Sequence, residues 1–367
     1  MQDNRFAGEM HRPQPRLSDA QQDLLDSPSP PPNRGGVTSF SLLPDPASPL
    51  ARESAAQAFA DILDGTAPEA EIEAFLIALS ERGETSIEIA EAARAMRQRV
   101  IPIRAPANAI DVCGTGGDGH HTLNVSTAVA IVVAAAGVPV AKHGNRAASS
   151  KSGAADTLEA LGLDLDRAAA NAESHLNDLG IAFLFAAKHH PAMARIAPLR
   201  RRIARRTIFN LMGPLANPAG VQRQLIGIAR PDYAPIYAEA LEQLGVKGAA
   251  IVAGEEGLDE LSPEGGSLVV SIGDVSLPAR ITPADAGLAS HPLISLRGGD
   301  AHENASALRK LLQGELGAYR DAVLLNAAAA LVVAGEAVDL REGAEEAAET
   351  IDKGLANALL DCWIAAA

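Results

Sequence analysis

Two short segments of this chain, 114–119 and 142–146, hold residue types that could do chemistry. The first reads GTGGDG, and its glycines leave backbone N–H groups uncovered, as phosphate binding requires. The second reads KHGNR, which brings two positive charges, and hydroxyl groups follow it closely. An apolar stretch with the pattern of one buried helix and one strand separates the two. Such a pair of loops suits a ligand that carries phosphates at both ends.

The segment 114–119 also satisfies the G-x-G-x-x-G pattern of dinucleotide-binding folds. Those folds carry an acidic residue about 20 residues further on, at the end of the next strand. Here that strand ends in Lys142-His143, and no carboxylate lies between Asp118 and this point. The missing acid argues against a dinucleotide. A glycine turn with a purely structural role is the other alternative, and the polar residues at 124–127 argue against it.

Two later segments carry groups that a phosphorylated substrate would need. Six arginines lie between residues 195 and 206, and one of them could clamp a substrate carboxylate through two hydrogen bonds. The spacing does not say which one, and a solvated helix face or an RNA-binding helix are the alternatives. Asp259-Glu260 follow an expected strand and a glycine turn. Adjacent carboxylates in such a loop suit Mg²⁺, above all when a diphosphate shares the ion.

The elements that must position these residues fall into two regions. Residues 51–100 have helical apolar spacing throughout, and Thr85-Ser86 followed by Glu88 predicts a helix start. After that, strands and amphipathic helices alternate. This repetition predicts a mainly parallel sheet with helices on both faces. The expected fold class is therefore α/β, with a small all-helical domain and a larger α/β domain.

The expected strands of the larger domain are short and apolar, at 110–113, 138–142, 181–185, 224–228 and 249–253. Residues 268–271 and 275–277, joined at Gly273-Asp274, predict a hairpin. Asn124 and Ser126 are expected to cap the apolar helix that follows them.

Composition excludes several classes of protein. Lys and Arg total 31 against 46 Asp and Glu, a net charge of −15, which argues against a nucleic-acid binder. Aromatic residues are only 3% of the 367, so small aliphatic side chains must fill the core. The two cysteines have no metal-ligand spacing, and no apolar run is long enough for a membrane helix. We expect a cytoplasmic protein with a disordered tail at 1–36, which lacks the apolar core of a signal peptide.

Seven segments follow one another along the chain: GTGGDG at 114–119, NVST at 124–127, KHGNR at 142–146, HPAM at 190–193, RTIFNLMGPLANP at 206–218, LDELS at 258–262 and GGDAHENA at 298–305. In this order, and without large gaps, they resemble the anthranilate phosphoribosyltransferase family. No single segment would be specific, but seven in register are. The similarity extends from about residue 40 to the C-terminus.

The resemblance implies an activity and an architecture. The activity is transfer of the phosphoribosyl group of 5-phosphoribosyl 1-diphosphate to the amine of anthranilate, the second step of tryptophan biosynthesis from chorismate, with two Mg²⁺ ions per monomer. The architecture is a helical domain hinged to an α/β domain, usually in a homodimer formed through the helical domains. The expected boundaries are 37–108 for the helical domain, with a contribution from about 188–215, and 109–187 with 216–367 for the phosphoribosyl-binding domain.

Carried over by position, the resemblance implies three sets of site residues. The phosphoribosyl diphosphate set is Gly114, Gly117, Asp118, Thr122, Asn124, Val125, Ser126, Thr127, Lys142, His143, Gly144, Asn145, Arg146, Ala147, Ala148, Ser149, Ser150 and Ala154. The anthranilate set is Gly114, Asn145 and Arg200, with Arg200 pairing with the carboxylate. The metal set is Ser126, Asp259 and Glu260. The expected catalytic residues are Lys142, Asp118 and Arg200.

Two positions depart from the family pattern. Ala154 stands where the family often has a serine that contacts phosphate, and Ser150 or Ser152 could compensate. Ala204 stands where the family prefers glycine, and we expect this to be harmless within a helix.

Two other functions stay open at this point. A pyrimidine nucleoside phosphorylase would share the architecture and also cradle phosphate, but the arginine run and the Asp259-Glu260 pair argue against it. A non-enzymatic relative that binds nucleic acid would be expected to lose the glycine loop or the carboxylate pair and to gain positive charge. This chain keeps both features and is acidic.

Overall fold

The computed structural model describes residues 41–147 and 151–367. The expected disordered tail at 1–36 and the predicted phosphate-loop residues Ala148, Ser149 and Ser150 lie outside the described residues. By its contacts the chain divides at Ser41, and the unit Leu42–Ala367 holds all the elements described below. Among the described residues, none of the helices combines the length and the apolar run that crossing a bilayer would take.

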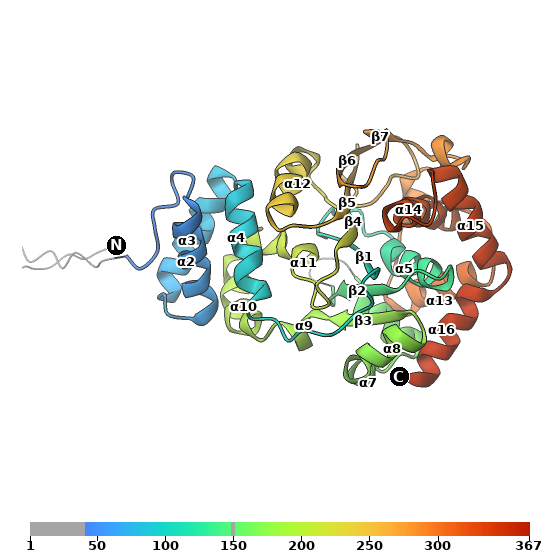
Figure 1. Ribbon diagram of the computed structural model, residues 1–367, viewed down its shortest axis with the longest axis horizontal. Coiled ribbons are helices and arrows are strands. Elements are labelled where there is room, and N and C mark those ends of the chain that lie inside the picture. The colour runs from blue at the N-terminus through green and yellow to red at the C-terminus, as the bar shows by residue number, and fades with distance from the viewer. Residues whose placement is uncertain (1–40, 148–150) are drawn as a thin grey trace, which may run out of the picture. The chain divides into compact units, whose positions relative to one another are not determined.

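The N-terminal part is a helical bundle of α2 (Arg52–Asp64), α3 (Glu69–Arg82) and α4 (Ser86–Arg97). The predicted start of α4 is confirmed, because the Thr85 hydroxyl accepts from the Glu88 N–H and the Glu88 carboxylate accepts from the Thr85 N–H. A later helix, α10 (Pro191–Ile203), packs against α2 and α3 (Figure 1). Phe59 lies edge-on to Phe75 and Phe209 in the core of this bundle.

Ala204 does not lie within a helix, so the expectation for this position is wrong. It follows the last residue of α10 with φ 51° and ψ 27°, in the left-handed region. An L-residue with a Cβ is disfavoured there by about 1–2 kcal/mol, whereas glycine is not. The family's preference for glycine at this position therefore has a physical reason.

We expect Ala204→Gly to stabilise the chain by about 0.5–1 kcal/mol, because relief of the left-handed strain exceeds the extra chain entropy that glycine loses on folding. Urea denaturation followed by circular dichroism measures the change. Ala194→Gly, on the exposed side of the same helix, is the control, and it should destabilise by about 1 kcal/mol. Equal losses for both variants would contradict the explanation.

The C-terminal part is built on one sheet with the strand order β3-β2-β1-β4-β5-β6-β7. The first five strands are parallel, and β6 and β7 are antiparallel to their neighbours. This confirms the predicted fold class. The strands are β1 (Ile110–Gly114), β2 (Val140–Gly144), β3 (Ile181–Phe185), β4 (Arg223–Gly227), β5 (Gly248–Gly254), β6 (Ser267–Gly273) and β7 (Arg280–Ile281).

The predicted hairpin at Gly273-Asp274 is confirmed in part: β6 and β7 form an antiparallel pair joined by residues 274–279, but the second arm is 280–281 and not 275–277. The partners of β6 are β5 on one side and the two-residue β7 on the other, so residues 275–277 form no strand. The apolar run Leu268–Ile272 has the pattern of a hairpin arm, but its long-range partner β5 cannot be read from local spacing.

Helices cover both faces of the sheet. On one face α5 (Val125–Ala135) and α14 (Ala318–Ala334) pack against β1 and β4, and on the other α11 (Met212–Leu215) and α12 (Ala234–Gln243) share a core with the helical bundle. Figure 1 shows α5 and α14 beside each other at the sheet. The remaining helices are α6 (Ala154–Leu161), α7 (Leu165–Ala170), α8 (Ala172–Asp178), α9 (Ala186–His189), α13 (Ala301–Leu312), α15 (Leu340–Asp352) and α16 (Leu355–Ala366).

Small residues fill the core, as the composition predicts. The α14 run 327–330 consists of four fully buried alanines, and α5 contributes a similar apolar run. A Cβ built on Gly343 of α15 would lie 2.9 Å from the backbone of Ala328. This close approach joins α15 to α14, and α14 in turn packs against α5, whose N-terminus bears the NVST segment.

Candidate active site

The predicted site residues gather at the carboxyl ends of the parallel strands. The chain passes from β1 to β2 on one side, and β4 lies on the other side of β1, so the strand order reverses at β1. Ligands of open α/β sheets bind outside the strand ends at such a point. The GTGGDG loop follows β1, the KHGNR segment ends β2, and Asp259-Glu260 follow β5.

Two paired glycines make room for the carboxylate loop. Gly114 at the end of β1 is in register with Gly227 at the end of β4. A Cβ on Gly114 would lie 2.3 Å from Oδ2 of Asp259, and a Cβ on Gly227 would lie 1.5 Å from the Asp259 carbonyl oxygen. Asp259 thus lies across both strands, and its Oδ2 accepts a hydrogen bond of 2.6 Å from the N–H of Gly116.

Three carboxyl groups converge here. Burial and then the charge of Asp118 raise the pKa of Asp259 to about 6. Burial and the charges of Asp259 and Asp118 raise the pKa of Glu260 well above its ordinary range. Oε2 of Glu260 is shielded from solvent and has no hydrogen-bond partner among the described residues. An unpartnered carboxylate oxygen beside two other carboxyl groups calls for a cation.

The donor set fits Mg²⁺, which prefers oxygen ligands and keeps several from substrate or water. Within the described ranges, no three His, Cys, Asp or Glu side chains are arranged to hold a metal by themselves. Asp259 and Glu260 could therefore supply part of a coordination shell. Ser126, the third predicted ligand, is adjacent, because its N–H donates to Oε1 of Glu260 at 3.1 Å.

The N-terminus of α5 holds one unpaired side-chain donor among the described residues. Asn124 occupies the predicted N-cap position, but its side chain makes no capping hydrogen bond. The Thr127 hydroxyl is buried and has no partner in the described part of the chain. Val125, the first helical residue, is buried, and its N–H bonds Leu123. The positive end of the helix dipole favours an anion at this point.

The Asn124 side chain instead belongs to a polar network that sequence reasoning missed. Its Oδ1 accepts from the Thr157 hydroxyl at 2.6 Å and from Nδ2 of Asn304 at 2.9 Å. Its carbonyl oxygen accepts from the Tyr319 hydroxyl at 3.1 Å. Thr157 and Asn304 are buried. The network fixes the start of α5 to α6, α13 and α14; Asn304 stands in the GGDAHENA segment, which was the available signal.

Lys142 is 3% exposed, and its side chain makes hydrogen bonds within the site. Its Nζ donates to the Val112 carbonyl at 2.8 Å and contacts the Ser126 hydroxyl at 3.2 Å. Burial lowers its pKa, and the charges of Asp111 and Glu260 oppose this shift. Asp111 is buried in β1 and accepts from the His143 N–H. The Nζ atom of Lys142 is therefore held in place between β1 and the start of α5.

His143 has a structural environment. Its Nδ1 lies 2.7 Å from the Gly213 carbonyl and its Nε2 lies 3.2 Å from Nε2 of His190. Burial lowers the pKa of His143 to about 3 and that of His190 to about 4. Both rings are neutral at physiological pH, which disfavours an acid–base role for them.

The segment after β2 is organised by Asp156. The Asp156 carboxylate accepts from the N–H groups of Ala147 and Gly153, and it pairs with Arg146 at 2.9 Å. Arg146 also pairs with Glu159 at 2.5 Å. The side chains of these carboxylates raise the pKa of Arg146 further. Arg146 is thus already balanced by two acids in this structure.

The compensation expected for Ala154 does not come from Ser152. The Ser152 hydroxyl is buried and bonds the Thr157 hydroxyl at 2.8 Å. Ala154 begins α6, with its Cβ close to Gly144. Ser150 lies outside the described residues, so only that half of the expectation stays open. Asn145 is exposed, and its carbonyl oxygen accepts from the N–H of Ala155.

The structure separates the six arginines. Arg202 pairs with Glu69 and Glu73 of α3, and Arg205 pairs with Glu81. Arg200 is partly buried, and its guanidinium has no hydrogen-bond or ion-pair partner among the described residues. Burial alone lowers its pKa. An unpaired, partly buried cation is the arginine best suited to receive a substrate carboxylate.

Two predicted residues lie in the loop between β1 and α5. Gly117 has φ 76° and is exposed. The backbones of Thr122 and Arg297 form an isolated antiparallel β-bridge, which brings the 298–305 segment beside the site.

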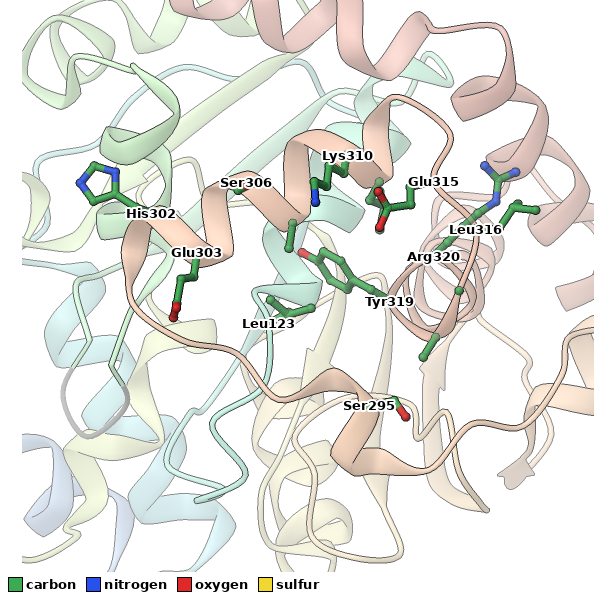
Figure 2. A pocket seen from close by; sticks show the side chains of 14 residues that line it. Leu123, Ser295, His302, Glu303, Ser306, Lys310, Glu315, Leu316, Tyr319 and Arg320 are labelled. Carbon is green, nitrogen blue, oxygen red and sulfur yellow. The ribbon is translucent and has the colours of Figure 1, made fainter.

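A cavity of about 680 Å³ lies beside this group of residues (Figure 2). It is lined by α13, the loop 313–317 and the start of α14, with Lys310 and Tyr319 at its centre. None of the predicted site residues lines it. It adjoins the site through Leu123, which lies between Thr122 and Asn124, and through the Tyr319 hydroxyl, which donates to the Asn124 carbonyl oxygen.

Comparison with protein families matches both parts of the chain. Residues 47–100 match the helical bundle domain of a glycosyl transferase family, and residues 106–357 match the a/b domain of the same family. The anthranilate phosphoribosyltransferase of Novosphingobium aromaticivorans is 68% identical over 329 residues, which cover 89% of this chain and 99% of that protein.

Solved structures of anthranilate phosphoribosyltransferases have a similar fold. The crystal structure of anthranilate phosphoribosyltransferase from Thermus thermophilus superimposes with a TM-score of 0.81 at 43% identity, covering 87% of this chain and 96% of that one. The Saccharomyces cerevisiae enzyme in complex with PRPP and Mg gives 0.78 at 29% identity, covering 86% and 93%. A further structure of the yeast enzyme contains 4-fluoroanthranilate, with a TM-score of 0.78 at 28% identity, covering 86% and 93%.

Proposed function

Because this chain belongs to the anthranilate phosphoribosyltransferase family, we propose that its site transfers the phosphoribosyl group of 5-phosphoribosyl 1-diphosphate to the amine of anthranilate. The observation that carries the proposal is the buried carboxyl group of Glu260 at the carboxyl ends of the strands: it lies beside Asp259 and Asp118, and its Oε2 has no partner among the described residues. The family membership favours this transferase over the phosphorylase and nucleic-acid-binding alternatives.

The chain's own residues divide between the two substrates. The start of α5, from Asn124 to Thr127, the glycine loop with Gly114, Gly117, Asp118 and Thr122, and the segment from Lys142 to Ala154 would bind the phosphates. Arg200, with Gly114 and Asn145, would hold anthranilate through its carboxylate. Lys142, kept in place by Val112 and Ser126, would face the charge that grows on the leaving diphosphate.

Asp259, Glu260 and Ser126 would hold Mg²⁺, with two ions per chain. When bound, the metal would neutralise the diphosphate and make it a better leaving group. The binding of PRPP and Mg by the yeast relative supports Mg²⁺ as the metal.

The reaction is a substitution at the anomeric carbon of ribose. A bond forms between the anthranilate nitrogen and this carbon, and the bond from the carbon to the diphosphate oxygen breaks with its electron pair. The amine then loses a proton to solvent. Holding the weakly basic amine in line with the leaving group would supply much of the rate acceleration.

A fluorescence assay tests the proposal. Anthranilate fluorescence should fall with time when the protein, 5-phosphoribosyl 1-diphosphate and Mg²⁺ are all present, and should stay constant when any one is omitted. Diphosphate release should match the anthranilate consumed. No loss of fluorescence, together with phosphate-dependent cleavage of thymidine or uridine, would overturn the proposal in favour of a nucleoside phosphorylase.

We also propose that the chain works in the cytoplasm as a homodimer formed through its helical domain, with the boundaries 37–108 and about 188–215 for that domain and 109–187 and 216–367 for the α/β domain. The packing of α10 against α2 and α3 supports the contribution of 188–215.

A further inference from the structure

Arg206 begins the RTIFNLMGPLANP segment, yet the proposed function gives it no role. Its Nη1 lies 3.2 Å from the Gly117 carbonyl oxygen and its Nη2 lies 3.0 Å from the Gly116 carbonyl oxygen. In the described part of the chain it pairs with no carboxylate. The Ser80 hydroxyl of α3 donates to the Arg206 carbonyl at 3.0 Å. One guanidinium therefore donates hydrogen bonds to two consecutive carbonyl groups of the glycine loop.

These two hydrogen bonds orient the backbone N–H groups of the glycine loop. In a planar trans peptide the N–H points opposite to the C=O of the preceding residue. With the carbonyls of Gly116 and Gly117 turned to Arg206, the N–H groups of Gly117 and Asp118 face the other way. Neither has a hydrogen-bond acceptor among the described residues. Two adjacent free N–H groups on one side of a loop form an anion-binding nest.

The local backbone makes this orientation depend on Arg206. Gly116 and Gly117 have φ of 69° and 76°, and both are exposed. Glycine populates many other conformations at little cost, so the loop by itself would not keep its carbonyls on one side. A Cβ on Gly117 would lie 3.4 Å from the Arg206 guanidinium, which leaves little room between them.

We propose that Arg206 is a positioning residue for diphosphate, which fixes the glycine loop so that the N–H groups of Gly117 and Asp118 face the ligand. The inference rests on the proposed function, since that function supplies the diphosphate. A fork with two parallel N–H groups is needed for two carbonyls, and only arginine carries one.

The test compares Arg206→Ala, Arg206→Lys and Arg205→Ala. Arg205 is the matched control, because it is the adjacent arginine and, among the described residues, its one ion pair is with Glu81 on the surface. Steady-state kinetics should give an increase of about 10-fold or more in the KM for 5-phosphoribosyl 1-diphosphate for Arg206→Ala, with the KM for anthranilate within about twofold. Arg206→Lys keeps the charge but not the fork, so it should recover only part of the loss.

Calorimetric titration with inorganic pyrophosphate and Mg²⁺ gives a second readout that does not need turnover. Its Kd should rise in Arg206→Ala and stay unchanged in Arg205→Ala. Unchanged binding in Arg206→Ala, or full recovery in Arg206→Lys, would overturn the inference. If the wild type binds pyrophosphate but transfers nothing to anthranilate, the proposed function fails, and the Arg206 binding data still decide the inference.

Discussion

Replacing Glu260 by glutamine should lower kcat/KM by about 10²- to 10³-fold and raise the Mg²⁺ concentration needed for half-maximal rate. The substitution keeps the shape of the side chain but removes the negative charge that a divalent cation would neutralise. Developing charge on the leaving diphosphate then loses its strongest counter-charge. Initial rates measured over a Mg²⁺ titration give both quantities.

Stability separates this effect from misfolding. Burial and the charges of Asp259 and Asp118 raise the pKa of Glu260, so the ionised carboxylate is destabilising in the absence of metal. We therefore expect Glu260→Gln to unfold at the same temperature as the metal-free wild type or a higher one. Glu255→Gln, which removes an exposed partner of Arg280 in the neighbouring turn, is the control and should keep its metal dependence. An unchanged Mg²⁺ titration in Glu260→Gln would refute the metal assignment.

Replacing Arg200 by glutamine should raise the KM for anthranilate by about 10- to 100-fold, because one charge-assisted pair with the carboxylate is lost. The KM for 5-phosphoribosyl 1-diphosphate should stay within about twofold. Arg200 makes no hydrogen bond or ion pair among the described residues, so its replacement by glutamine removes none and should leave the fold intact. Kinetics with each substrate varied in turn distinguish the two constants.

Arg201→Gln is the matched control for Arg200, since Arg201 is the next residue of α10 and is exposed without a described partner. It should leave both KM values unchanged. Aniline, which is anthranilate without its carboxylate, gives a sharper check. It should bind to the wild type and to Arg200→Gln equally weakly. If Arg200→Gln left anthranilate kinetics untouched, another residue would hold the carboxylate.

Local sequence patterns predicted the strands, helix starts and loops that are determined by residues adjacent in the chain. The alternation of strands and helices predicted the five parallel strands, and Thr85 with Glu88 predicted the start of α4. Glycine at 114 and 116–117 predicted an open loop after β1. Each of these depends on spacing or on the intrinsic preferences of a few adjacent residues.

Long-range partners explain the errors and omissions. Asn124 has the type of a helix cap, but Thr157 and Asn304, far along the chain, take its side chain. Ala204 looks compatible with a helix until the left-handed backbone is known. Six arginines in one run are equivalent by spacing, and only burial and ion pairs separate Arg200 from the others.

The crossing of Asp259 over Gly114 and Gly227 couples three distant positions in evolution. Neither glycine can gain a side chain while the Asp259 loop lies across it, because each Cβ would collide with that residue. A lineage that abandons the metal could first move this loop, and only then would substitutions at both glycines become neutral. Joint drift at the ends of the first and fourth strands would thus mark descendants of this fold that have given up the reaction.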